Sequence, residues 1–312
     1  MICVLILVLA SAPGFGQSSA KSAAQPGTAA VAAATAVPAI PKDPKDLMLL
    51  AAKVNGLGGR DMKPWHLKAN YQTFDADGKP KDKGVFEEWW AGPEKWKVSY
   101  TSNGFNQVRY GTGKKMLMTG DDTAPSLVDE LLERLLAQPM PKPNAIKWQK
   151  YVVQNAMDGS VALTCVRENS KSTLVPVYCF GIDSPVLRLE ALRDGNMASF
   201  NNIVSMDGKY IAKRIDVKFA SLPVLQVQVT TLAPLTKVDD AALAPPPGAV
   251  AALLPPQFVS LDDLRLISIG KHPETPHIAR AAHVHGTVIV AMIISPKGNV
   301  SEVRVISGPA ML

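Results

Sequence analysis

Residues 215–219 read Ile-Asp-Val-Lys-Phe, and residues 225–229 read Leu-Gln-Val-Gln-Val. In both stretches apolar side chains alternate with polar ones. Successive side chains of a β-strand point to opposite faces, so this alternation predicts strands with one buried and one solvated face. Residues 95–100, Lys-Trp-Lys-Val-Ser-Tyr, show the same period. We therefore expect a set of half-buried antiparallel strands between about residues 64 and 232.

Turn and helix signals divide this region into elements. Asp-Gly pairs, which favour hairpin turns, occur at residues 77–78, 158–159, 194–195 and 207–208. A first helix is predicted from Asp43, as the N-cap, to Asn55. A second is predicted over residues 125–137, with leucines on one stripe and the charged residues, Asp129, Glu130, Glu133 and Arg134, facing away. The predicted fold class is mainly β with α, built on one antiparallel sheet with one or two helices.

Composition excludes some classes of protein. Of 312 residues, 47% are hydrophobic and 19% charged, which is typical of a folded chain rather than a disordered one. The net charge of +6 is mild and its lysines form no dense block, so we expect no nucleic-acid partner.

The N-terminus and the prolines predict the domain organisation. Residues 1–16 read as a signal peptide, since an apolar run precedes small residues, although the usual basic start is missing. An uncleaved inner-membrane anchor is the alternative. A flexible leader is predicted over residues 17–42, a β-rich domain over 43–233, a Pro/Ala-rich linker over 234–257 and a second unit over 258–312.

Two cysteines, Cys165 and Cys179, lie in neighbouring strand-like segments. An even pair in an exported protein favours one disulfide across a hairpin, and two buried free thiols are the alternative. His283 and His285 flank Val284 near the C-terminus, but no obvious set of ligands surrounds them, so we read a solvated loop. We expect no metal site, no cofactor and no catalytic residue, because no nucleophile, phosphate-binding or zinc-protease motif is found.

The C-terminal residues predict a short helix over 276–282, a strand over 287–295, a turn over 296–299 and a second strand over 300–306. This segment resembles the first half of the TonB C-terminal domain from about residue 276 to residue 312. Seven residues carry the motif: Gly286, Thr287, Gly298, Val303, Val305, Ser307 and Gly308. In that family a second helix and a last strand follow, which the printed sequence does not contain.

In the β-rich region, residues 64–69 and 87–93 look like the sheet-rich N-terminal domains that precede TonB-type modules in some bacterial envelope proteins. The order of helix, strands, helix and strands is similar to the open half-barrel of the LolA/LolB lipoprotein carriers. That resemblance implies an apolar cavity for an acyl chain. Its lining is predicted from the aromatic residues of the first half of the sheet: Trp89, Trp90, Trp96, Tyr100 and Phe105. An ordinary core between sheet and helix is the alternative.

The two resemblances imply a non-enzymatic periplasmic envelope protein. The TonB resemblance implies energy-coupled transport across the outer membrane through contact with an outer-membrane receptor or another envelope protein. The carrier resemblance implies the alternative, a module that binds lipid or lipoprotein. Because the C-terminal hairpin carries a two-sided apolar strand, self-association through this hairpin is also expected.

Overall fold

The computed structural model describes residues 40–75, 77–121, 127–141, 150–170, 175–192, 195–219, 221–252, 274–284, 288–294 and 300–307. For residues 127–130, 289–294 and 301–307 it describes the backbone alone.

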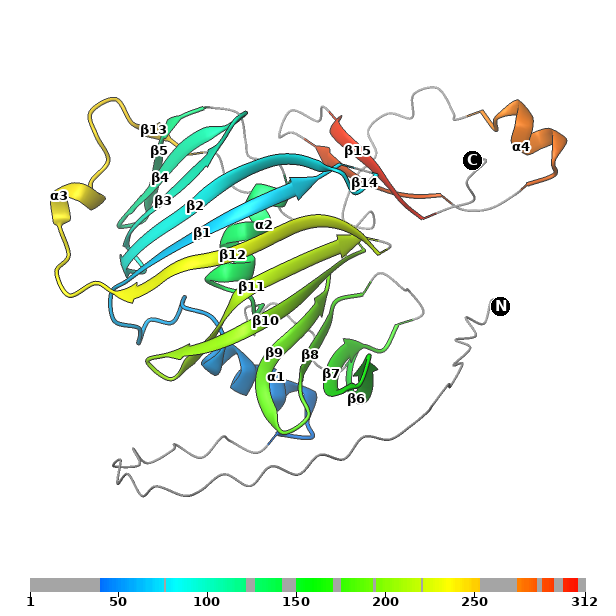
Figure 1. Cartoon of the computed structure of the whole chain (residues 1–312), viewed down its shortest axis with the longest axis horizontal. Coiled ribbons are helices and arrows are strands. Elements are labelled where there is room, and N and C mark those ends of the chain that lie inside the picture. Colours follow the sequence, from blue (N-terminus) through cyan, green and yellow to red (C-terminus); the bar gives the residue numbers. More distant parts are fainter. Residues whose placement is uncertain are drawn as a thin grey trace, which may run out of the picture. The chain divides into compact units, whose positions relative to one another are not determined.

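Thirteen strands of the described chain form one open antiparallel sheet (Figure 1). Its order is β13-β5-β4-β3-β2-β1-β12-β11-β10-β9-β8-β7-β6, so β13 and β6 are the two edges. The predicted mainly-β fold with an open antiparallel sheet is therefore confirmed. The strands are β1 (Trp65–Phe74), β2 (Pro80–Gly92), β3 (Lys95–Ser102), β4 (Asn106–Thr112), β5 (Lys115–Gly120), β6 (Tyr151–Asp158), β7 (Val161–Glu168), β8 (Val177–Gly181), β9 (Ser184–Ala191), β10 (Asn196–Met206), β11 (Lys209–Phe219), β12 (Leu222–Pro234) and β13 (Val250–Ala251).

One long-range pairing joins the two halves of this sheet. β1 pairs antiparallel with β12, from Trp65 opposite Pro234 to Thr73 opposite Leu225. Every other neighbouring pair, apart from β5 with β13, follows the chain order through hairpins or short connections. The residues that read most clearly as strands therefore lie at the centre of the sheet.

Hairpin turns form at three of the four predicted Asp-Gly pairs, at residues 77–78, 158–159 and 207–208, while Asp194 lies outside the described residues. Asp207 and Gly208 connect β10 to β11 with φ angles of 49° and 76°. Two consecutive residues with positive φ define a type I′ turn, whose twist matches that of the flanking strands. Glycine adopts this conformation without strain.

Helix α1 (Pro44–Val54) begins at Asp43, whose carboxylate accepts hydrogen bonds from the backbone N–H groups of Lys45 and Asp46. It ends at Asn55, whose side chain donates to Pro185 O at 2.7 Å and accepts from Leu187 N at 2.9 Å. Asn55 thus caps the helix and fastens it to β9.

Helix α2 (Leu127–Leu136) packs on one face of the sheet, called the inner face below. Figure 1 shows the helix behind β1, β12 and β11. Leu132, Leu135 and Leu136 are buried in the same core cluster as Trp65 and Leu67 of β1, and the helix contacts β11 and β12. The predicted leucine stripe is therefore the contact between helix and sheet.

The predicted linker contains regular structure where it is described. Helix α3 (Asp240–Leu243) contacts β3, and Asp240 forms an ion pair with Lys95. β13 then pairs with β5 through Val250 and Ala251. Residues 250–251 thus belong to the sheet, and the proposed boundary at residues 233–234 remains a prediction.

The C-terminal segment contains helix α4 (His277–Ala281) and a separate two-stranded antiparallel sheet of β14 (Ile289–Ile294) and β15 (Val300–Ser307). These elements agree with the predicted helix and two strands, although α4 and β14 are shorter than predicted and β15 is one residue longer. The predicted turn over 296–299 lies outside the described residues.

Candidate functional site

The five aromatic residues predicted to line a cavity do not all lie on one face of the sheet. Trp90 and Tyr100 are buried in the core, and Trp96 and Phe105 pack against it. Trp89 lies on the other face, because neighbouring residues of a strand point to opposite sides. The ring of Trp90 instead stacks on Trp65, with centroids 5.9 Å apart.

The inner face holds little empty space among the described residues. A pocket on this face lies between the C-terminal end of α2 and the strands β9 to β11, and it has room for about one water molecule. An acyl chain would need far more space. The described side chains of α2 and of the strands form one buried core cluster on this face, and the acyl-chain cavity stays a prediction.

The inner face also carries buried polar side chains near α2. Glu88 is 5% exposed, and its Oε2 has no hydrogen-bond partner among the described residues. Tyr100 donates its hydroxyl to Glu133 Oε2 of α2 at 3.3 Å, and the guanidinium of Arg109 lies 5.2 Å from the Tyr100 ring centroid. Arg109 is held by Gln107, whose Oε1 accepts from its Nε at 2.7 Å.

Burial raises the pKa of Glu88 well above its usual value of 4.5, and the nearby charge of Glu133 raises it further. A buried carboxylate loses its hydration, so the neutral acid is favoured in the folded chain. The sequence contained a signal for this site, because Glu88 shares the alternation of Phe86 and Trp90, which predicts the buried face.

This pKa shift predicts how stability depends on pH. Between 4.5 and the raised pKa, the folded chain keeps a proton that the unfolded chain releases, so the free energy of unfolding falls as the pH rises through this window. Glu88→Gln removes the ionisable group. At about pH 8 we expect the variant to be more stable than the wild type by about 1–2 kcal/mol. At about pH 4 the difference should vanish, because both states of the wild type are then protonated.

Urea unfolding at both pH values measures this difference. Glu87→Gln is the matched control, because Glu87 precedes Glu88 but lies on the outer face in ion pairs with His66 and Lys68. The control should show no gain at the higher pH. An equal effect of Glu88→Gln at both pH values would exclude a raised pKa.

Two charged residues of α2 hold it to the sheet on opposite flanks. Glu133 accepts from Tyr100 of β3, and Arg134 Nη1 donates to Glu190 Oε1 of β9 at 2.8 Å. The sequence predicted that both would face away from the sheet. That prediction was wrong, because long side chains at the edges of the leucine stripe reach polar residues that the sheet buries. Glu190 is 1% exposed.

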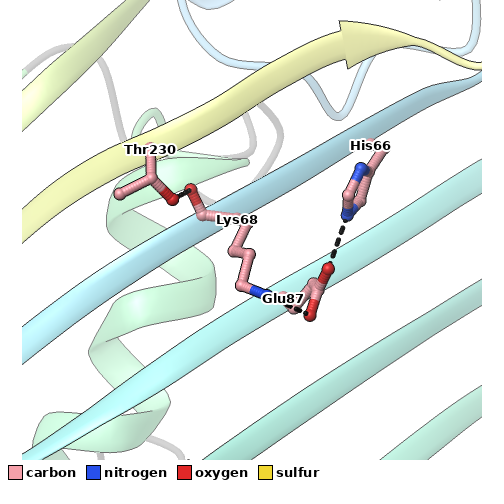
Figure 2. A network of polar contacts seen from close by, with 4 residues as sticks. All are labelled: His66, Lys68, Glu87 and Thr230. Atoms are coloured by element: carbon pink, nitrogen blue, oxygen red, sulfur yellow. Dashed lines mark hydrogen bonds and ion pairs between the residues drawn. The ribbon is translucent and has the colours of Figure 1, made fainter.

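A second polar cluster lies on the outer face, where β1 and β2 pair (Figure 2). His66 Nε2 lies 2.8 Å from Glu87 Oε1, and Lys68 Nζ lies 3.3 Å from Glu87 Oε2. Thr230 of β12 donates its hydroxyl to Lys68 O at 3.2 Å. One carboxylate is therefore held by two basic side chains, and all three strands are linked.

An aromatic row continues from this cluster across the outer face. The rings of His66 and Trp89 stack with centroids 5.0 Å apart and planes inclined by 9°. Lys97 Nζ lies 5.0 Å from the centroid of Trp89 and 5.9 Å from that of Tyr110. These residues are direct cross-strand neighbours on β1, β2, β3 and β4. Such pairs stabilise a sheet, so the row is explained by the fold.

Cys165 of β7 and Cys179 of β8 form a disulfide between directly opposed residues. Both are buried, together with Leu163. The structure therefore brings together the cysteine pair that the sequence singled out.

The TonB-like motif is only partly described. Val303, Val305 and Ser307 lie in β15, opposite Met292, Val290 and Ile289 of β14. The four remaining motif residues, Gly286, Thr287, Gly298 and Gly308, lie outside the described residues. Each strand of this hairpin has one paired side within the described part of the chain.

No group of three or more His, Cys, Asp or Glu residues that could hold a metal is found among the described residues. Of the two histidines near Val284, His283 is exposed and His285 is not described. None of the described helices is long and apolar enough to cross a bilayer.

The chain thus combines an open antiparallel sheet with a short C-terminal α-β-β segment. Residues 271–312 match the model of the Gram-negative bacterial TonB protein C-terminal family. This match confirms the resemblance predicted from the motif. A comparison with curated proteins finds no match.

Solved structures with a similar fold include a LolA superfamily protein from Nitrosomonas europaea. It is 10% identical, with a TM-score of 0.43, and the similarity covers 65% of this chain and 98% of that one. A DUF1329 family protein from Desulfovibrio piger is 11% identical, with a TM-score of 0.42, covering 64% of this chain and 95% of that one. At these identities the likeness concerns the fold alone.

Proposed function

We propose that this protein is a non-enzymatic component of the bacterial cell envelope that works in the periplasm. Its TonB-type segment would bind an outer-membrane receptor or another envelope protein during energy-coupled transport. The family match at residues 271–312 is the observation that carries this proposal.

The architecture of the segment supports binding by strand addition. A peptide that joins a sheet edge gains main-chain hydrogen bonds, and the side-chain pockets beside the edge give specificity. β14 and β15 form a sheet of their own within the described chain, so their backbone edges are not used by the thirteen-stranded sheet. The large sheet would then serve as the body that carries this binding segment.

Site-specific photocrosslinking in Gram-negative cells tests the proposal. A photoreactive amino acid at Val303 or Val305 of β15 should yield crosslinks to an outer-membrane protein, identified by mass spectrometry. The matched control carries the same group at Thr230, an exposed residue of β12 in the body. We expect the crosslink yield from β15 to be at least about tenfold higher, because strand addition places the partner in direct contact.

Equal yields from β15 and Thr230, or none from β15, would argue against this function. Native mass spectrometry of the purified chain separates it from the alternative, a lipid or lipoprotein carrier. A carrier should retain stoichiometric lipid, whereas the buried core cluster on the inner face of the described chain leads us to expect none.

A further inference from the structure

The two edges of the large sheet differ in how they are protected. At one edge, β13 is two residues long and follows the prolines at positions 245–247. Short strands and prolines are common ways to prevent edge-to-edge pairing. At the other edge, β6 is eight residues long and contains neither proline nor lysine. In the described part of the chain, no strand pairs with its outer side.

The backbone groups that β6 presents at this edge follow from its pairing with β7. Residues 150 and 169 stand opposite each other in the continued register, and Lys150 O accepts a hydrogen bond from Asn169 N at 2.6 Å. In an antiparallel ladder such hydrogen-bonded positions alternate along the strand. Gln154, opposite Cys165, is therefore also directed toward β7. Val153, Asn155 and Met157 consequently direct their N–H and C=O groups to the outer side.

We propose that β6 pairs antiparallel with β6 of a second copy of this chain, forming a two-fold symmetric dimer with a continuous sheet. A two-fold axis beside Gln154 places this residue opposite its own copy. Val153 then faces the partner's Asn155, and each such pair exchanges two backbone hydrogen bonds. The register pairs outward-directed positions with outward-directed positions, as a ladder requires.

Charge complementarity selects this register. With Gln154 on the axis, Lys150 at one end of β6 lies opposite the partner's Asp158 at the other end, and the symmetry generates this contact twice. Both side chains are exposed in the single chain. They cannot meet within one chain, since about eight residues of extended strand, or roughly 26 Å, separate them.

The side chains at the same edge also favour burial. Met157 is 65% exposed, which is high for an apolar side chain in a strand. The proposed register covers it with the partner's Tyr151, and a thioether beside an aromatic ring is a favourable contact. In this dimer the inner faces of the two sheets lie on one side and the outer faces on the other, because the two side chains of each opposed pair point to the same side.

Analytical ultracentrifugation of the full chain, with charge-reversal variants, tests the proposal. For the wild type, the fraction of dimer should rise with protein concentration over the range up to about 100 µM. Lys150→Glu places like charges opposite each other twice, and so does Asp158→Lys. Each variant alone should weaken dimerisation by about tenfold or more. An equal mixture of the two should restore it, because every opposed pair in the mixed dimer is then oppositely charged.

Asn155→Pro provides a second variant that keeps the fold. Proline removes an N–H group directed outward and leaves the bonds to β7 intact, so dimerisation should be lost while the melting temperature of the monomer stays unchanged. A wild-type chain that stays monomeric, or a mixture that fails to restore the dimer, would overturn the proposal. Slow amide exchange of Val153 and Asn155 in a monomer would also overturn it, since another segment would then cover the edge.

Discussion

Replacing Arg134 with leucine is expected to lower the free energy of unfolding by about 2–3 kcal/mol. Arg134 lies 2.8 Å from the carboxylate of Glu190, which is 1% exposed. Removing the cation takes away a direct ionic contact of that buried carboxylate. The Arg134 side chain is 36% exposed, so the expected loss lies below that for a fully buried pair. Urea unfolding measures it.

Two further variants test whether this loss of stability comes from the broken ion pair. Arg134→Leu combined with Glu190→Leu should recover most of the lost stability, because an apolar pair can replace a buried ion pair at little cost. Arg214→Leu is the matched control, since Arg214 pairs with Asp216 on the exposed face, and it should cause no resolvable change. If Arg134→Leu and Arg214→Leu were equally mild, α2 would not depend on its ion pair.

Replacing both Cys165 and Cys179 with alanine is expected to cost about 3 kcal/mol. The disulfide closes a segment of 14 residues, and the constraint on the unfolded chain supplies most of this stabilisation. For a chain of this size, the melting temperature should fall by roughly 2–4 °C for each kcal/mol. Thermal unfolding followed by circular dichroism measures the shift.

A reductant provides the internal control for the disulfide. It should destabilise the wild type by the same amount and leave the double alanine variant unchanged. Alkylation of the protein unfolded without reductant, followed by peptide mapping, tests the alternative of two buried thiols. A wild type that is insensitive to reductant and carries alkylated Cys165 and Cys179 after unfolding would contradict the bond.

Most of the fold could be predicted from local pattern. The alternation at residues 95–100, 215–219 and 225–229 identified strands that the structure contains as parts of β3, β11 and β12. The capping residues Asp43 and Asn55 identified both ends of α1. These signals act over a few residues, so they do not depend on distant contacts.

The candidate sites were less predictable, because they depend on which residues share a face. Trp89 and Trp90 were grouped by composition, yet they lie on opposite faces of β2. Glu133 and Arg134 were assigned to solvent by helical periodicity, but their partners Tyr100 and Glu190 lie far away in sequence. Helical periodicity indicates the apolar stripe, whereas it does not indicate what polar groups the opposing sheet buries.

The sequence by itself determined the strands and their turns, the cysteine pair and the TonB-type C-terminal motif, because alternation, turn chemistry and short motifs are written into neighbouring residues. Only the tertiary structure decided that β1 pairs with β12, that α2 packs on the inner face and that β6 is an edge among the described strands. These features join segments far apart in the chain, and their free energy arises only once the whole sheet has assembled. Local patterns of residues therefore carry little information about them.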